Sequence, residues 1–287
     1  MQAKTGPADD ADDCVGDRAE HRAADSCSAG RKPGSGDLPG ALYPIWQWLV
    51  LVPVVVLATI VAAPIVIVMS LLGYKRAANL RVAASWARLI AWLTPMDVEV
   101  EGSGRLDPAQ RYIVVANHRS QYDIPLIYGF CGLDLRWVMK AEIGRIPFVA
   151  QGCRAIGHIF IDRGRPDQAR AAINAAVARL PEGTGVLFFA EGTRSRSGEL
   201  MPFRKGAFRV AVDRNLPILP MTVTGTRSIL PPGSLRVRPG RGRLVIHEPI
   251  WPRALPTDEA ISDLCLRTRA TIAAELENSP ARPDGAD

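Results

Sequence analysis

Residues 112–123 read YIVVANHRSQYD. The first five are apolar and rich in β-branched side chains, whereas most of the rest are polar, so we expect a buried strand that ends in a turn. Helical spacing of apolar residues follows over 122–130. A strand, a polar turn and a helix in this order are typical of one unit of an α/β sheet.

The same order of elements recurs along the chain after residue 97. Short β-rich runs alternate with helical stretches of about 10–15 residues, which favours an α/β fold with a mixed, largely parallel sheet flanked by helices. The predicted strands are 98–100, 112–115, 137–139, 158–161, 186–189, 218–223 and 244–246, and the predicted helices are 122–130, 166–180 and 257–276.

An uncharged stretch separates Asp37 from Lys75, and its most apolar part is residues 45–72. A helix over this part would be about 42 Å long, enough to cross a hydrocarbon core of about 30 Å. Pro53 and Pro64 leave two shapes open, namely one kinked membrane-spanning helix or two short helices that form a hairpin in one leaflet. A buried helix of a soluble core is disfavoured by the length of the uncharged run.

Composition divides the chain further. Residues 1–40 are polar, carry 8 acidic and 5 basic side chains, and are expected to form a disordered tail. Residues 41–94 form the membrane-associated segment, which ends in an amphipathic helix over 77–93. An α/β domain is expected over 95–278, with a short C-terminal tail at 279–287.

The net charge and the cysteines limit the partners and the compartment. The chain carries +6 overall, and a basic body suggests an anionic partner. Five scattered cysteines without a CxxC pair argue against a disulfide framework and a zinc ribbon, and they fit a reducing compartment. Basic residues follow the apolar run closely, which favours a domain on the cytoplasmic face of the inner membrane. They are Lys75, Arg76, Arg81 and Arg88.

The first polar turn carries a candidate catalytic pair, His118 and Asp123. A carboxylate that binds Nδ1–H of a histidine leaves Nε2 free to accept a proton. On a continuous helix these two positions would point about 140° apart, so the pair requires the chain to turn between them. The alternative is a surface histidine followed by an aspartate that caps a helix.

Two further strands end in charged turns. Residues 157–163 place Arg163 where it could reach an anion at the same sheet edge, although an exposed Asp162–Arg163 turn is the alternative. Residues 188–195, FFAEGTRS, combine a permissive Gly192 with Arg194, which suits a phosphate. Glu191 could orient a neighbouring cation or bind a hydroxyl group.

Residues 203–206 and 216–221 complete the pattern. FRKG opens a helix with Arg204 and Lys205 near its N-terminus, a favourable position for an anion. The run LPILPM has prolines at both ends of a short apolar strand, which predicts an edge strand or a bulged strand near a groove. Packing is the simpler role for this second run.

In this order and spacing, NHRSQYD at 117–123, IFIDR at 159–163, FAEGTRS at 189–195 and LPILPM at 216–221 resemble the PlsC-like glycerolipid acyltransferases. The resemblance covers residues 75–250. The third block of that family usually has proline where this chain has Ala190, which affects only the stiffness of the turn.

The resemblance implies that His118 is the general base, that Asp123 orients it, and that the other motif residues bind a glycerol-phosphate acceptor. It also implies transfer of a fatty acyl group from acyl-CoA or acyl-carrier protein to 1-acyl-sn-glycerol-3-phosphate, with no cofactor, no metal and no acyl-enzyme intermediate. The acceptor-binding residues would be Arg163, Glu191, Gly192, Thr193, Arg194 and Lys205.

Three alternatives remain open from the sequence. The acceptor could be another lysolipid, such as lyso-ornithine lipid. A metal-dependent hydrolase would need His118, Asp123, His158 and Asp162 to converge on one ion, although no HExxH-like spacing supports it. A non-catalytic membrane-binding or nucleic-acid-binding protein would explain the basic body, but there is no P-loop and no aromatic-rich basic stripe, so we expect no nucleic acid partner.

Overall fold

The computed structural model describes residues 42–162, 164–195 and 197–279. The predicted tail 1–40, Arg163 and all but the first residue of the predicted tail 279–287 lie outside this range. The described chain forms a seven-stranded sheet of order β1-β7-β6-β2-β5-β3-β4. Neighbouring strands are parallel except β6 and β7, which confirms the predicted mixed, largely parallel sheet. The strands are β1 (Met96–Glu101), β2 (Tyr112–Ala116), β3 (Asp134–Lys140), β4 (Ile159–Ile161), β5 (Thr184–Phe189), β6 (Ile218–Thr224) and β7 (Gly240–Ile246).

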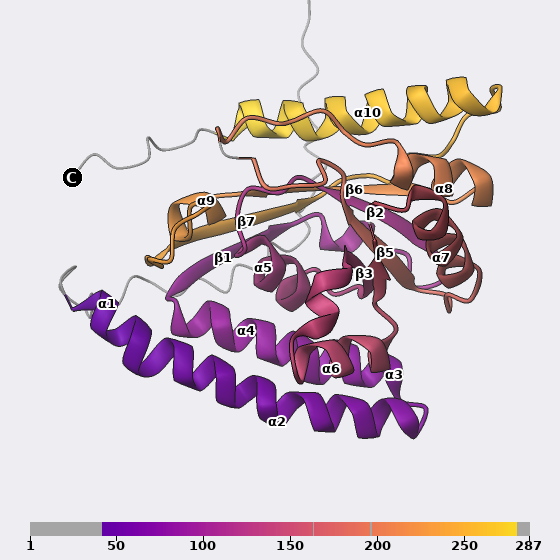
Figure 1. Cartoon of the computed structure of the whole chain (residues 1–287). Helices are drawn as coiled ribbons and strands as arrows, with labels where there is room; N and C mark the ends of the chain where they lie inside the picture. The colour runs from indigo at the N-terminus through magenta and orange to yellow at the C-terminus, as the bar shows by residue number, and fades with distance from the viewer. Residues whose placement is uncertain (1–41, 163, 196, 280–287) are drawn as a thin grey trace, which may run out of the picture.

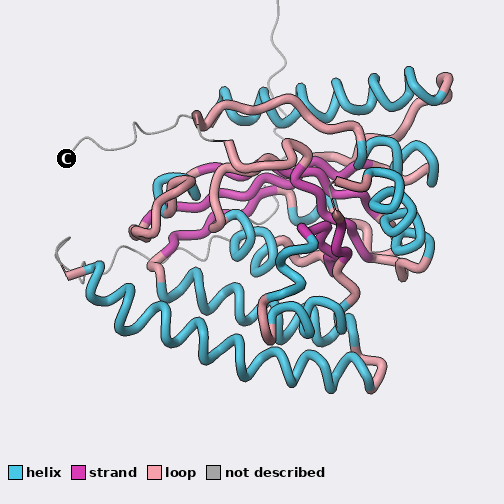
Figure 2. Tube along the Cα trace, in the orientation of Figure 1, coloured by secondary structure: helices cyan, strands magenta, loops and turns pink. Residues whose placement is uncertain are grey.

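Helices cover both faces of this sheet (Figure 1, Figure 2). One face carries α4 (Ala84–Leu93), α5 (Asp123–Phe130) and α6 (Val149–Ile156), and the other carries α7 (Pro166–Ala178), α8 (Gly206–Arg214) and α10 (Thr257–Asn278). Short turns of helix lie at Ser103–Arg105, Ala141–Arg145 and α9 (Thr226–Ile229). The predicted helices 122–130, 166–180 and 257–276 are confirmed, whereas α6 and α9 were not predicted.

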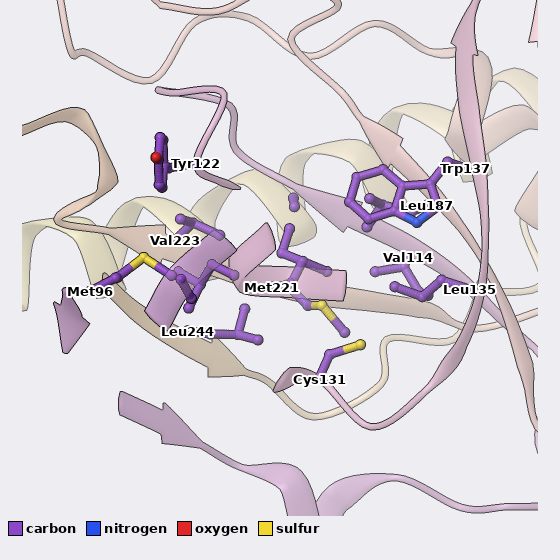
Figure 3. Close-up of a cluster of buried hydrophobic side chains, with 14 of the residues drawn as sticks. Met96, Val114, Tyr122, Cys131, Leu135, Trp137, Leu187, Met221, Val223 and Leu244 are labelled. Atoms are coloured by element: carbon purple, nitrogen blue, oxygen red, sulfur yellow. The ribbon is translucent and has the colours of Figure 1, made fainter. Parts of the chain in front are cut away.

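Strand β2 lies in the middle of the sheet and is buried on both faces. Ile113 and Val115 pack toward α8 and α10, while Val114 and Ala116 belong to the cluster on the α4 and α5 side. Figure 3 shows Val114 in that second cluster beside Leu135 and Leu187. Burial on both faces explains why the run YIVVA is apolar without alternation.

The apolar N-terminal segment is one helix rather than two. It comprises α1 (Tyr43–Trp46), a π-helical turn (Gln47–Leu51) and α2 (Val52–Leu71), and it continues through Pro64. Pro53 has no N–H for the carbonyl four residues earlier, and the wide π-helical turn just before it accommodates this loss. The prediction that 45–72 could fold into two short helices is therefore wrong.

A helical hairpin nevertheless forms, because the chain reverses at Gly73, where φ is 89°. Its second arm consists of α3 (Lys75–Ala77), a π-helical turn (Ala78–Ala83) and α4, which lies between α2 and the sheet (Figure 1). The predicted amphipathic helix over 77–93 is this arm. The structure thus has an apolar helix followed by a helix that packs on the domain.

The N-terminal helix Tyr43–Leu71 lies lengthwise on the domain and contacts it at two places. Near the start, the backbone amide of Val237 donates to Gln47 Oε1 at 2.9 Å. In the second half, Ala63 packs on Gly152 of α6, where a Cβ atom would lie 3.6 Å away. The outer face of the helix is apolar and exposed, with Val56, Leu57, Ile60, Val61, Ile65, Val68 and Leu71.

A chain of buried hydrogen bonds joins the hairpin to the sheet. Asn79 of the second arm donates to the carbonyl of Leu135 at 2.9 Å and accepts a bond from the Tyr128 hydroxyl. That hydroxyl lies 3.2 Å from Nε2 of His158, and the amide of Trp137 donates to His158 Nδ1 at 3.3 Å. Burial, reinforced by the charge of Arg136, lowers the pKa of His158 to about 3, so the imidazole is neutral.

The prediction of an edge strand at 216–221 is wrong, because β6 lies inside the sheet between β7 and β2. The alternative of a bulged strand at 216–221 is not met either, because the extra residue lies in the partner segment that follows β7. Met221 pairs with Ile246 and the carbonyl of Pro220 accepts from the amide of His247, but Ile218 pairs with Ile250, so one extra residue lies opposite Leu219, next to Pro220. Since proline has no N–H for the ladder, this bulge allows it to occupy a central strand.

Candidate active site

The polar turns meet at the carboxyl edge of the sheet. Ala116, the last residue of β2, is in register with Phe189 of β5 and with Met221 of β6, and all three strands are parallel. His118 and Glu191 therefore each lie two residues after the paired residues Ala116 and Phe189. Parallel strands bring the residues after their carboxyl ends to one edge, which is the usual place for a site in an α/β sheet.

His118 and Asp123 form the predicted pair. The chain turns over 117–122, α5 begins at Asp123, and His118 Nδ1 lies 2.8 Å from the buried carboxylate Oδ2. Because a carboxylate only accepts, Nδ1 carries the proton. Nε2 has no hydrogen-bond partner among the residues that the structure describes, and the side chain is 13% exposed. This arrangement can accept a proton at Nε2.

The aspartate holds the turn and does not cap its own helix. Its Oδ2 also accepts hydrogen bonds from the backbone amides of Arg119 and Ser120, at 2.7 and 2.9 Å. Its other oxygen accepts a bond from the hydroxyl of Thr226, a buried residue at the start of α9. The carboxylate is thus fully buried and hydrogen-bonded at both oxygens, so its position and orientation are fixed.

Two residues of this arrangement were missed in the sequence. Thr226 is 103 positions away from Asp123, and no local pattern marks it. The sequence predicts only that Phe189 belongs to a strand, but its ring stacks on the His118 imidazole with centroids 3.8 Å apart and an angle of 11° between the planes. The stack on Phe189 fixes the plane of the His118 imidazole, while the hydrogen bond to Asp123 fixes how the imidazole is turned within that plane.

Asn117 ties the strand ends together. Its side-chain amide donates to the carbonyl of Val223, and its oxygen accepts from the amide of the same residue, both at 2.8 Å. The amide side chain therefore continues the β2–β6 pairing by one position beyond Ala116. This bond pair sets where the chain leaves the sheet just before His118.

Glu191 is a brace between two loops. It is 4% exposed, and its carboxylate accepts hydrogen bonds from the backbone amides of His118 at 2.7 Å and Met201 at 3.0 Å. Burial raises the pKa of Glu191, and the two backbone hydrogen bonds oppose that shift. One carboxylate oxygen binds the loop of His118 and the other binds the loop of Met201. The direct role of this side chain is therefore to fix the backbone of the catalytic turn.

Two arginines belong to the segments next to this turn. Gly192 has φ of 77°, and a Cβ atom there would lie only 2.5 Å from Arg204 Nε, so the guanidinium packs directly on the glycine. Arg194 is half-buried and precedes Ser195, whose amide donates to the carbonyl of His118 at 3.0 Å. Thr193 is exposed at the same turn.

Lys205 points elsewhere. Its Nζ lies 3.2 Å from Ser262 Oγ on α10. Of the cations expected at the site, Arg194 lies in the loop whose next residue bonds the carbonyl of His118, Arg204 packs on Gly192, and Lys205 is directed to the neighbouring helix. Arg163 lies outside the described residues.

The residues of the metal-dependent alternative do not gather. Within 42–162, 164–195 and 197–279, no group of three or more histidine, cysteine, aspartate or glutamate side chains could hold a metal ion. Both ring nitrogens of His158 are engaged by Trp137 and Tyr128. The hypothesis of a metal-dependent hydrolase therefore has no set of metal ligands in the described part of the chain.

Comparison with known proteins identifies the family. Residues 97–224 match the family model described as Acyltransferase. A 1-acyl-sn-glycerol-3-phosphate acyltransferase of Chlamydomonas reinhardtii is 32% identical over 234 residues, which cover 80% of this chain and 67% of the relative. The chain belongs to the acyltransferase family. It is therefore an enzyme of acyl transfer.

Further relatives carry the same name. A 1-acyl-sn-glycerol-3-phosphate acyltransferase of Limnanthes douglasii is 34% identical, and the match covers 53% of each chain, so it spans about half the length of that relative. The crystal structure of the 1-acyl-sn-glycerophosphate acyltransferase PlsC from Thermotoga maritima superposes with a TM-score of 0.71 at 27% identity. That match covers 84% of this chain and 98% of the other.

Proposed function

We propose that this acyltransferase transfers a fatty acyl group from a thioester donor, acyl-CoA or acyl-carrier protein, to the free hydroxyl of 1-acyl-sn-glycerol-3-phosphate. The product would be phosphatidic acid, a precursor of phospholipids. One observation carries the proposal, namely that the His118–Asp123 pair shares the carboxyl edge of the sheet with Arg204 and with the loop that contains Arg194. The names of the relatives supply the acceptor.

The chemistry follows from the state of His118. Nε2 removes the proton from the acceptor hydroxyl as its oxygen attacks the thioester carbonyl, and the buried Asp123 carboxylate stabilises the imidazolium that forms. The carbon–sulfur bond then breaks, and the imidazolium returns the proton to the departing thiolate. The products are an ester and a free thiol. The thioester is already activated, so no acyl-enzyme is required.

The arginines supply the positioning. Arg194 and Arg204 flank the turn at Gly192, and a guanidinium fork matches the oxygens of a phosphate. We propose that they bind the acceptor phosphate together with Arg163 and Thr193, with Lys205 at the outer side of the site. Holding the phosphate presents the hydroxyl to Nε2, and such orientation can remove several kcal/mol, up to about 7–11, from the barrier.

We further propose that residues 41–94 attach the domain 95–278 to one leaflet of the inner membrane, on its cytoplasmic face. Helix Tyr43–Leu71 is apolar and long enough to cross a bilayer. It also bonds to the domain near its start and packs on α6 in its second half, which supports a position along the domain rather than across the bilayer. The supported arrangement is a helix that lies in the interface with its exposed apolar face in the lipid.

The test is acyl transfer by purified protein in detergent, with radiolabelled acyl donor and a panel of lysolipid acceptors. We expect lysophosphatidate to be the preferred acceptor, and His118→Ala to abolish transfer while circular dichroism stays unchanged. Preference for lyso-ornithine lipid would overturn the acceptor. Substantial transfer by His118→Ala would overturn the base.

A further inference from the structure

A strained turn precedes α6. Phe148 has φ of 62° and ψ of −48°, and the amide of Val149 donates to the carbonyl of Pro147 at 2.7 Å. These values describe a γ-turn with positive φ, a conformation that is rare for a residue with a large side chain. Such strain persists where the surroundings impose it, and it is a reason to ask what the turn does.

The same turn exposes large apolar side chains. Residues 145–148 are all exposed, with Ile146 at 49% and Phe148 at 43% of their full accessible area. About half of each of these two side chains stays in water, where it gains no hydrophobic burial that could offset the backbone strain. A surface of this kind is typical of a contact with another apolar phase.

The position of the turn indicates that this apolar phase is the lipid bilayer. It begins α6, which packs on α2, and Figure 1 shows α6 beside the second half of α2. It also follows β3 closely, because Lys140 ends that strand at the carboxyl edge of the sheet. The turn therefore lies between the lipid-facing helix and the edge that carries the site.

The charges around the turn fit an anionic surface. Lys140, Arg145 and Arg154 are exposed near it, together with the carboxylates of Glu142 and Asp162, and the second of these already pairs with Arg165. The Arg154 guanidinium donates to the carbonyl of Gly144 at 3.0 Å and lies 5.3 Å from the ring centre of Phe160, so it is held at the rim. An apolar tip with a cationic rim complements acyl chains below anionic headgroups.

We propose that the turn formed by Ile146, Pro147 and Phe148, named here the α6 turn, inserts into the acyl region of an anionic phospholipid leaflet. It is a second membrane contact, separate from α2, and it holds the carboxyl edge of the sheet at the bilayer surface. Part of this inference rests on the proposed function, because it assumes that α2 faces lipid. It adds that the catalytic edge itself touches the leaflet.

A fluorescent probe tests the contact without any catalysis. A full-length variant without native cysteines carries Phe148→Cys labelled with an environment-sensitive dye, and it is mixed with phosphatidylglycerol–phosphatidylcholine vesicles. We expect a blue shift and quenching by brominated lipids. The matched control is Leu266→Cys, which is 68% exposed on α10 across the sheet, and its dye should not respond. Vesicle-bound protein without a response at position 148 would overturn the proposal.

Kinetics separate a membrane role from a structural one. Phe148→Ser should lower kcat/KM for lysophosphatidate in anionic vesicles about tenfold, through lost apolar burial. It should leave the rate on a monomeric short-chain lysophosphatidate unchanged. Phe148→Gly removes the backbone strain and the ring together. Equal loss in Gly and Ser variants supports insertion, whereas full activity of the Gly variant in vesicles would overturn it.

The outcomes also separate this inference from the proposed function. Wild-type protein that acylates no lysophosphatidate in either form would refute the proposed function, and the dye at position 148 would still decide whether the α6 turn enters lipid. Wild-type protein that is active in vesicles, with a silent dye and a fully active Phe148→Ser variant, would refute only the α6 turn.

Discussion

Replacing Thr226 by valine removes one hydrogen bond from the buried partner of the proposed base. Thr226 and Asp123 are both inaccessible to solvent, and the Thr226 hydroxyl donates to Asp123 Oδ1. Valine keeps the shape of threonine but offers no donor. The carboxylate retains its bonds to His118 Nδ1 and to two backbone amides through Oδ2, so the change isolates the oxygen that faces Thr226.

The size of the effect follows from burial and charge. A hydrogen bond to a charged group contributes about 1.5–3 kcal/mol, and no water can replace the lost donor at a fully buried oxygen. For a domain of this size, about 2 kcal/mol corresponds to a fall in Tm of roughly 4–8 °C. The imidazolium formed in the transition state depends on the same carboxylate, so kcat should fall roughly tenfold to hundredfold.

Thermal denaturation and steady-state acyl transfer measure the two effects, with Thr226→Ser as the matched control. Serine keeps the hydroxyl, so its Tm and kcat should stay close to those of the wild type. The reasoning is refuted if the valine variant keeps full stability and full kcat, or if the serine variant loses as much as the valine variant.

Three further predictions address the brace, the arginines and the buried histidine. Glu191→Gln leaves one backbone amide without an acceptor, so it should lower the free energy of unfolding by about 1–3 kcal/mol and reduce kcat; unchanged thermal denaturation would contradict the brace. Arg194→Ala should raise KM for the acceptor with little effect on KM for the donor, whereas Arg253→Ala, an exposed control, should change neither; a defect in donor KM alone would contradict the phosphate role. His158 has a folded pKa of about 3, so the unfolded chain binds its proton first as the pH falls. The free energy of unfolding should then decrease below about pH 6.5, at up to about 1.4 kcal/mol per pH unit, and urea titrations should show a flatter pH dependence for His158→Gln.

The strands could be predicted because each is a short apolar run buried in a covered sheet. Helix α6 could not, because its sequence VAQGCRAI is short and mixes polar with small side chains. The error at 216–221 has a physical origin as well. Proline in a strand indicates an edge, but here an extra residue opposite Leu219, next to Pro220, is supplied by a segment that follows β7, far along the chain.

In the candidate site, too, contacts that are local in the sequence could be predicted, whereas contacts between distant segments could not. His118 and Asp123 could be paired from the sequence because one turn of chain joins them. Thr226 and the stacking of Phe189 depend on the order of strands in the sheet, which no local pattern contains. Arg204 and Lys205 are adjacent, and only the observed orientation of α8 shows that one packs on Gly192 while the other reaches α10.

Contacts run without a break from the N-terminal hairpin to the proposed base. Asn79, Tyr128 and His158 are joined by buried hydrogen bonds to the backbone of Trp137, whose ring lies 5.8 Å from that of Phe189, and Phe189 stacks on the His118 imidazole. A shift of the hairpin against the sheet would leave several of these polar groups unsatisfied, at about 1–3 kcal/mol each. The hairpin and the base therefore belong to one rigid unit. In the proposed function, this rigidity fixes the distance between His118 Nε2 and the membrane surface. The acceptor hydroxyl then has to move out of the leaflet only by that distance to be acylated.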